Sequence, residues 1–242
     1  MFVAKDAKSI NEQDWEAIEA QYAETSPYNY AVIDDFLAPD ACSEVRAHLI
    51  NNKGWAFMNV EGPQPVLVVR NFNLPLIHEI ASALIGRLAG VLGGLSLVEH
   101  SAFMNRSNNG LSIHSDNGLA TLNIYLTPDE FNLDPEAGGL WLYDVKRGEN
   151  QALHEFNSQP WCTEYFERHT KGGAVRIGYA FNRAILFDAR TLHAAERMRF
   201  AGGSVASHRL NLALRFDRPE QFRSRYDPYH LKGSAPVAGA GG

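Results

Sequence analysis

The sequence predicts one mainly β domain with flanking helices, of the α+β class, in which N-terminal helices back a β-sandwich or barrel. Two observations carry this prediction. Helical periodicity of apolar residues dominates the chain before residue 95, and a series of short β-rich runs, most of them bounded by Gly, Asn, Asp or Pro, follows it to residue 216. Helices that precede a series of strands are typical of a helix-backed β fold, whereas a βαβ fold alternates the two.

The N-terminal part contains three expected helices. Residues 11–25 are polar with apolar points at helical spacing, which indicates an amphipathic surface helix. The run 30–36 (YAVIDDF) predicts a short strand, and Pro39 opens a helix directly after it. A third helix is expected over residues 75–90, again opened by a proline, and the glycine pair that begins at Gly93 ends it.

The β-rich runs that follow are short and end near turn-forming residues. A Gly-rich loop leading from a strand into a helix, which would cradle a phosphate, is missing from the sequence. The glycine pairs that begin at Gly138 and Gly172 both lead into β-like runs instead. The expected strands are residues 95–105, 110–114, 120–126, 139–143, 174–180, 184–187 and 209–216.

The net charge and the cysteine content indicate which binding partners and which cellular compartment to expect for this protein. The net charge is −6, which does not suit a protein that follows a phosphate backbone, so we expect no nucleic-acid partner. Two distant cysteines, Cys42 and Cys162, form no CxxC pair and indicate a reducing compartment. Residues 1–10 lack the apolar core of a signal peptide, and the most apolar stretch, 80–98, is interrupted by Arg87 and four glycines. We therefore expect a soluble cytoplasmic protein without a membrane partner; nothing in the sequence specifies the number of subunits.

The first motif with chemical content is His114-Ser115-Asp116, at the end of a β-like run. Residues i and i+2 of a strand project to the same face, so the imidazole and the carboxylate can converge on one metal ion. A chain with nine histidines often contains such a tripeptide by chance. The alternative of a strand-end histidine followed by a turn-forming aspartate therefore stays open at this point.

A second histidine strengthens the metal-site interpretation. Residues 183–187 (RAILF) predict a buried strand, and His193 comes just past it, 77 residues after Asp116 (193 − 116). Two ligands on one strand and a distant histidine on another form a 2-His-1-carboxylate facial triad. Such a triad binds one face of Fe(II) and leaves the remaining positions open.

The final β-like run adds a cation. Arg209, Asn211, Ala213 and Arg215 alternate with leucines, so they share one face of the expected strand. An inward-facing arginine on a barrel wall requires an anion, and a dicarboxylate co-substrate supplies one through two parallel charge-assisted hydrogen bonds, with Asn211 able to add another. The alternative is a solvated outer face on which Arg209 and Arg215 are exposed.

The combination of HxD, a distal histidine and an arginine that opens the last core strand resembles the Fe(II)/2-oxoglutarate dioxygenases, especially their prolyl-4-hydroxylase-like branch. Residues 30–49 (YAVIDDFLAPDACSEVRAHL), 121–126 (TLNIYL) and 137–140 (AGGL) resemble that branch too. The resemblance covers roughly residues 28–217.

Two features depart from the family pattern. The separation of 16 residues between His193 and Arg209 (209 − 193) is longer than the family shows, which makes Arg215 the fallback anchor. A long insertion also precedes the strand of the distal histidine. Trp161, Tyr165 and Phe166 recur in it at helical spacing, either as a helix-packing face or, as we expect, as part of a substrate lid.

For the fold, the resemblance implies a double-stranded β-helix (jelly-roll, cupin-like) core at about residues 95–217, backed by the N-terminal helices. This core is expected within a single domain over residues 1–232, with the insertion at about 144–182. The small residues of 233–242 (GSAPVAGAGG) are expected to form a disordered tail.

For the site, the resemblance implies Fe(II), 2-oxoglutarate as co-substrate and O₂, used to hydroxylate an unactivated C–H of a small molecule or of an amino-acid residue in a peptide, with release of succinate and CO₂. The carboxylate of the HxD motif favours hydroxylation over halogenation. The expected metal ligands are His114, Asp116 and His193, and the expected 2-oxoglutarate contacts are Arg209, Asn211 and Asn105. The alternatives are a cupin-like metal-binding or sensor protein, which has no use for a buried guanidinium, and a zinc hydrolase with the same ligands.

Overall fold

The structure is a computed structural model, in which most helices precede most strands as expected, although short strands lie between the early helices and a helix over Trp161–His169 lies among the later strands. The N-terminal residues, the last 22 residues of the chain and several loop residues lie outside the description, including the predicted tail at 233–242. The described residues are 8–57, 66–106, 109–149, 151, 156–157 and 159–220.

The helices begin where the sequence supplies a suitable first turn. Asp14 caps the first helix by accepting a hydrogen bond from the backbone N–H of Ala17 at 3.0 Å, and prolines open the next two. The helix expected over 75–90 is interrupted at Leu88, whose backbone is non-helical, and a short separate helix follows. The helices are α1 (Trp15–Glu24), α2 (Pro39–Asn51), α3 (Pro75–Arg87), α4 (Ala89–Leu92) and α6 (Trp161–His169).

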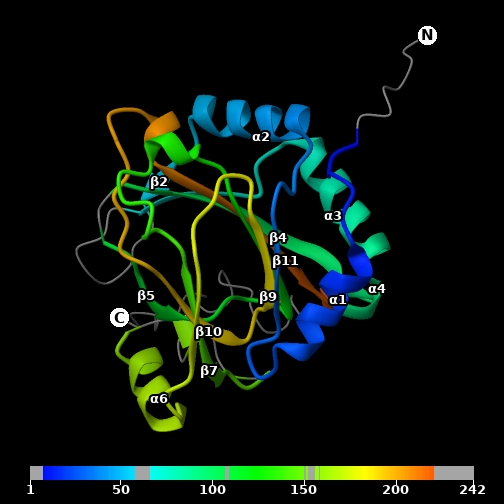
Figure 1. The fold of residues 1–242 in the computed structure, drawn as a ribbon, viewed down its shortest axis with the longest axis vertical. Helices are drawn as coiled ribbons and strands as arrows, with labels where there is room; N and C mark the ends of the chain where they lie inside the picture. The colour runs from blue at the N-terminus through cyan, green and yellow to red at the C-terminus, as the bar shows by residue number, and fades with distance from the viewer. Residues whose placement is uncertain are drawn as a thin grey trace, which may run out of the picture.

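Two antiparallel sheets form a jelly-roll core, and helices flank it (Figure 1). The larger sheet has the order β1-β9-β6-β11-β4-β3-β2, and the smaller has the order β5-β10-β7-β8. The strands are β1 (Tyr30–Ile33), β2 (Ala56–Phe57), β3 (Val66–Arg70), β4 (Ser96–Asn105), β5 (Leu111–His114), β6 (Ala120–Tyr125), β7 (Leu140–Lys146), β8 (Ala174–Ile177), β9 (Ala184–Asp188), β10 (Thr191–Ala195) and β11 (Arg209–Asp217).

Strands β2, β3 and β10 are absent from the sequence prediction. His193 follows the predicted strand β9, as expected, and it lies in the middle of a further strand, β10, that was not predicted separately. Asp188 ends β9 and accepts the backbone N–H of Arg190 at 3.0 Å, which turns the chain back into β10. Only Ala189 and Arg190 separate β9 from β10, so the sequence did not mark the five residues of β10 as a separate strand.

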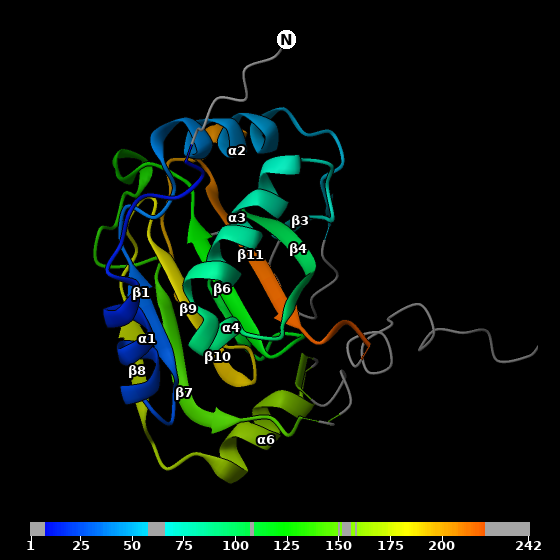
Figure 2. The same ribbon diagram turned by 90° about the vertical axis from the view of Figure 1, so that its right-hand side faces the viewer.

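The outer face of the larger sheet carries the main apolar core. Figure 2 shows α2, α3 and α4 on the same side of this sheet. Leu210, Leu212 and Leu214 of β11 belong to this core, so the alternate residues of β11 face the space between the two sheets. Arg209 and Arg215 are 2% and 7% exposed, so the alternative of a solvated outer face is wrong.

The segment expected as an insertion contains both sheet and helix. It includes the end of β7, helix α6 and strand β8, which pairs with β7. Cys162 of α6 lies in a small apolar cluster on the smaller sheet, and Tyr165 and Phe166 pack against that cluster. Tyr165 and Phe166 therefore form the helix-packing face that was the alternative to a lid, whereas Trp161 is 52% exposed.

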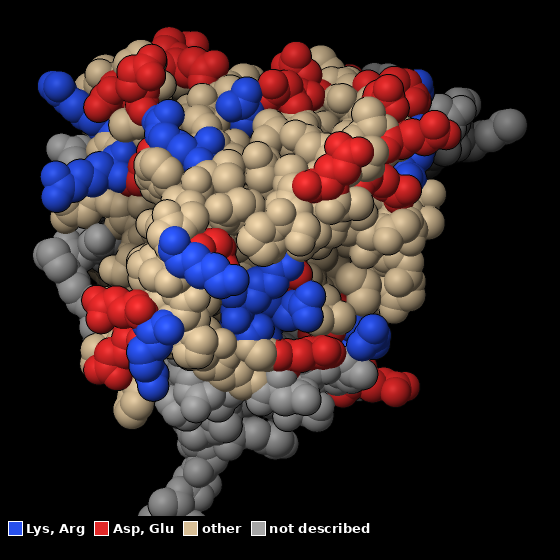
Figure 3. Space-filling model, turned by 60° about the horizontal axis from the view of Figure 1, so that its bottom comes forward, with Lys and Arg blue, Asp and Glu red and all other residues tan. Residues whose placement is uncertain are grey.

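The surface carries charges of both signs. On the face shown in Figure 3, basic side chains gather in a small central group and acidic side chains form separate groups around it. No helix in the described part of the chain combines the length and the apolar character needed to cross a bilayer.

Candidate active site

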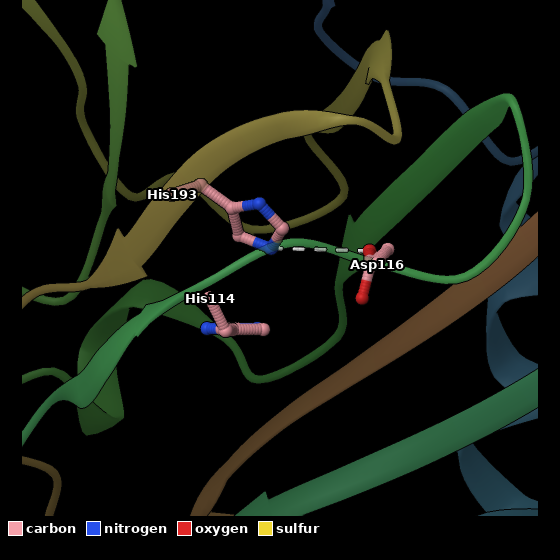
Figure 4. A group of neighbouring side chains, drawn as sticks. All are labelled: His114, Asp116 and His193. Carbon is pink, nitrogen blue, oxygen red and sulfur yellow. Dashed lines mark ion pairs between the residues drawn. The ribbon is translucent and has the colours of Figure 1, made fainter. Parts of the chain in front are cut away.

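The three predicted metal ligands lie together at one end of the space between the sheets (Figure 4). His114 and His193 are direct cross-strand partners on β5 and β10, and their ring centroids are 4.3 Å apart. Asp116 follows β5, where its backbone N–H donates to the carbonyl of Ala189 at 3.0 Å. One potential ligand atom of each residue lies within 4.8 Å of the others, and no other such group of three exists among the described residues.

Both histidines are held in the form that binds a metal through Nε2. Nδ1 of His114 lies 2.8 Å from the carbonyl of Ser112, and Nδ1 of His193 lies 2.9 Å from the carbonyl of Thr191. Because a carbonyl only accepts, each Nδ1 donates its proton, which leaves Nε2 as the nitrogen of each ring that can bind a metal. Burial lowers the pKa of His114 to about 4, and the neighbouring His193 adds to this effect. His114 is therefore neutral at neutral pH.

Asp116 is held as an anion. Its Oδ1 accepts a hydrogen bond from Arg215 at 3.3 Å, and its Oδ2 accepts one from the hydroxyl of Thr121 at 2.9 Å. Burial by itself raises the pKa of Asp116, but the charge of Arg215, the two histidines and the Thr121 hydrogen bond outweigh it and hold this pKa well below its usual range. Oδ2 also lies 3.8 Å from Nε2 of His193, so the carboxylate faces the other two ligands.

Arg215, the fallback anchor for a diacid, lies against the carboxylate of Asp116. It also donates to Glu99 at 2.9 Å and to the hydroxyl of Ser101 at 3.1 Å. Its hydrogen bonds therefore go to side chains of the protein, and its charge balances that of a buried metal ligand. The sequence offered one signal for this role, since a buried aspartate needs a nearby cation and Arg215 shares the inward face of β11.

The predicted co-substrate residues lie toward the other end of β11. Arg209 donates to the carbonyl of Gly138 at 3.0 Å and to Oδ1 of Asn211 at 3.1 Å. Asn105 is the strand partner of Arg209 on β4 and is 9% exposed. The guanidinium of Arg209 lies 4.9 Å from the ring centre of Tyr125. Arg209, Asn211 and Asn105 therefore share the inner wall that also carries Arg215.

Tyr125 is a polar residue of this wall that sequence reasoning missed. Its ring is completely buried, and its hydroxyl makes no hydrogen bond of acceptable geometry with the described residues. Burial raises the pKa of Tyr125, although the charge of Arg209 opposes this, so the hydroxyl keeps its proton and can donate it. The alternation of TLNIYL places Tyr125 on the same face as Asn123, which was the available signal.

An elongated dianion fits this wall chemically. Arg209 and the unsatisfied hydroxyl of Tyr125 lie toward one end, and the ligand triad lies at the other. A buried hydroxyl that makes no hydrogen bond destabilises the folded protein, unless a bound group supplies the missing hydrogen-bond partner. Between Asn211 and Arg215 the inward position of β11 is Ala213, whose methyl group adds neither a charge nor bulk. The donor set of two imidazoles and one carboxylate suits a divalent transition metal such as Fe(II).

No protein-family model and no curated protein sequence matches this chain. Solved structures match it over most of its length at low sequence identity. SnoK, a non-haem α-ketoglutarate-dependent carbocyclase from nogalamycin biosynthesis, aligns with a TM-score of 0.60 and 17% identity over 96% of this chain and 94% of SnoK.

Two further structures agree with this match. A prolyl hydroxylase from Trichoplax adhaerens, in complex with a peptide fragment of hypoxia inducible factor, aligns with a TM-score of 0.57 and 15% identity over 90% of this chain and 99% of its own. HygX from Streptomyces hygroscopicus, with nickel, 2-oxoglutarate and hygromycin B bound, aligns with a TM-score of 0.54 and 15% identity over 82% of this chain and 85% of HygX. The chain therefore has the fold of the Fe(II)/2-oxoglutarate oxygenases, the family that its HxD motif and distal histidine resemble.

Proposed function

We propose that this protein is an Fe(II)- and 2-oxoglutarate-dependent dioxygenase that hydroxylates an unactivated C–H bond and releases succinate and CO₂. The observation that carries the proposal is the pairing of two features in the space between the two sheets. A His-Asp-His cluster lies toward one end, and a buried cation beside an unsatisfied tyrosine hydroxyl lies toward the other. A metal-only sensor or a zinc hydrolase accounts for the first feature and not for the second.

His114, Asp116 and His193 would hold the iron through Nε2, a carboxylate oxygen and Nε2. When bound, the metal supplies the redox chemistry that couples the use of O₂ to decarboxylation of 2-oxoglutarate and oxidation of the substrate. Hydrogen bonds within the protein already orient the side chains of the three proposed ligands. The carbonyls of Ser112 and Thr191 fix the two imidazoles, and Arg215 with Thr121 fixes the carboxylate.

Arg209 would bind the distal carboxylate of 2-oxoglutarate, with Tyr125 donating a second hydrogen bond and Asn211 and Asn105 beside them. A guanidinium and a phenol directed at one carboxylate give charge-assisted hydrogen bonds in a site screened from water. HygX, which shares this fold, is described with nickel and 2-oxoglutarate bound, and this supports the assignment of the co-substrate.

The substrate class is a small molecule or an amino-acid residue in a peptide. Structures of the same fold support both, since one is a prolyl hydroxylase with a peptide and another holds hygromycin B. SnoK is described as a carbocyclase, so the fold also supports oxidations other than hydroxylation. The reaction outcome therefore has to be measured on the product itself.

The test begins with anaerobic loading of the protein with Fe(II) and 2-oxoglutarate, followed by admission of O₂ with candidate peptides, amino acids and small molecules. We expect succinate in equal amount to the 2-oxoglutarate consumed, and a product that has gained one oxygen atom. Failure of the Fe(II)-loaded protein to bind 2-oxoglutarate would refute the proposal. A cyclised product without added oxygen would refute hydroxylation and keep the wider oxygenase assignment.

Replacing Tyr125 with phenylalanine tests the co-substrate pocket without breaking a hydrogen bond within the described part of the protein. A hydrogen bond to a charged group is worth about 1.5–3 kcal/mol, so 2-oxoglutarate affinity should fall roughly 10- to 100-fold. The melting temperature without co-substrate should stay the same or rise, because an unsatisfied buried hydroxyl has been removed. Calorimetric titration and thermal unfolding measure the two quantities, and unchanged 2-oxoglutarate affinity would exclude Tyr125 from the pocket.

A further inference from the structure

The loop that carries two of the three ligands is held by the segment that follows β7. The backbone N–H of Ser115 donates to the carbonyl of Phe156 at 2.9 Å. The side chain of Asn157 donates to the carbonyl of Ser115 at 3.0 Å, and that of Gln159 donates to the carbonyl of Ile113 at 2.9 Å. These bonds flank His114 on both sides along the chain.

Arg147, the first residue after β7, makes the most extensive of these contacts. Its Nε and Nη2 lie 3.3 and 3.2 Å from the carbonyl oxygen of Asp116, and Nη2 also donates to the carbonyl of Gly118 at 2.8 Å. The guanidinium lies 4.4 Å from the ring centre of Phe156, and Arg147 is only 2% exposed. The rigid, planar guanidinium of Arg147 therefore joins the ligand loop to the segment that follows β7.

The backbone around Gly118 is closely packed, so the ligand loop has little room to rearrange if the hydrogen bonds from Arg147 are lost. Gly118 has a φ of +93°, and a Cβ placed there would come within 2.9 Å of the carbonyl oxygen of Phe216. Within the described part of the chain, Arg147 is also the only residue whose side chain donates to the backbone carbonyl of Asp116. Arg215 and Thr121 fix the carboxylate of Asp116, whereas Arg147 fixes its backbone.

We propose that Arg147 is a positioning residue for the metal centre and that Arg147, Phe156, Asn157 and Gln159 brace the ligand loop rather than open and close as part of a lid. The proposal rests on the proposed function, because it assigns Arg147 a role toward the metal that this function requires. A lid has to leave the site for the substrate to enter, and such a movement would break the hydrogen bonds to Ile113, Ser115 and Asp116. Outer-sphere contacts of this kind are typically worth 10- to 100-fold in metal affinity or activity.

The test compares Arg147→Met and Arg147→Lys with a control, Tyr165→Phe. Lysine keeps the charge but cannot bridge two carbonyls with a planar fork. Tyr165 lies in α6, beyond these residues, and its hydroxyl donates to the carbonyl of Lys146 at 3.2 Å and not to the ligand loop. Metal affinity is measured by titrating the metal-free proteins with Co(II), followed by visible absorption, without 2-oxoglutarate or substrate. Circular dichroism fixes a temperature at which each protein is folded.

We expect Arg147→Met to weaken Co(II) binding about 10- to 100-fold, Arg147→Lys to weaken it by a smaller factor with an altered Co(II) spectrum, and Tyr165→Phe to bind like the wild type. If Arg147→Met does not fold, the Arg147→Lys variant decides the question. Wild-type Co(II) affinity and spectrum in a folded Arg147 variant, or an equal loss in Tyr165→Phe, would overturn the positioning role. A wild-type protein that binds Co(II) but not 2-oxoglutarate would instead overturn the proposed function and leave the positioning role standing.

Discussion

Replacing Asp116 with alanine is expected to abolish metal binding and to destabilise the fold at the same time. The change removes one of the three proposed metal ligands and takes from Arg215 the carboxylate that accepts its hydrogen bond at 3.3 Å. Breaking a buried ion pair by removing one partner costs about 3–5 kcal/mol, and because Glu99 still pairs with Arg215 we expect the lower end of that range. Co(II) titration and urea denaturation measure the two effects.

A double variant separates these two effects. Asp116→Ala combined with Arg215→Met removes both charges, so much of the lost stability should return while metal binding stays absent. Asp144→Asn is the matched control, since Asp144 accepts hydrogen bonds from Thr170 and Gly173 away from the triad, and this variant should keep the metal affinity of the wild type. Retention of metal affinity in Asp116→Ala would mean that Asp116 is not a ligand.

Replacing Arg209 with alanine is expected to weaken 2-oxoglutarate binding strongly and to leave the affinity for the metal unchanged. Arg209 is 2% exposed, and removing one partner of a buried, hydrogen-bonded charge pair costs about 2–5 kcal/mol, which corresponds to a loss of roughly 30-fold or more. Its contacts with Gly138 and Asn211 do not reach the triad, which is why metal binding should survive. Anaerobic calorimetry of 2-oxoglutarate binding to the Co(II)-loaded protein measures the loss.

Arg183→Ala provides the control for this experiment. Arg183 also carries a guanidinium in an ion pair, but its partner Asp34 is 61% exposed, and its side chain donates to Asp34 and to the carbonyl of Gly178 rather than to Asn211 or Gly138. We expect this variant to bind 2-oxoglutarate like the wild type. Equal affinities in the Arg209 and Arg183 variants would show that the distal carboxylate is bound elsewhere.

The parts of the site that were predictable from the sequence are those with a local signature. The HxD tripeptide places two candidate ligands two residues apart, although β5 ends at His114 and Asp116 lies in the loop after it. The alternation of residues 209–216 separates an inward polar face from an outward face of leucines, and it survives folding because a strand imposes a period of two. The N-terminal helices were predictable from their helical spacing and their opening prolines.

The parts that were missed depend on contacts between distant segments. Strand β3 is an unbroken apolar run, VLVVR, which periodicity cannot distinguish from a buried helical segment. Arg147 follows a strand without any repeating pattern, and its partner carbonyl lies 31 residues away on the ligand loop. The role of Arg215 likewise arises only when β11 pairs with β6 and brings it beside Asp116.

The most direct measurement is a crystal structure of the protein prepared anaerobically with Fe(II) and 2-oxoglutarate, with anomalous data collected at the iron edge. One anomalous peak should lie within coordination distance of His114, Asp116 and His193, with the far carboxylate of the diacid against Arg209 and Tyr125. A peak at another place, or a diacid whose far carboxylate lies away from that guanidinium, would contradict the assignment of this inner wall as an oxygenase site.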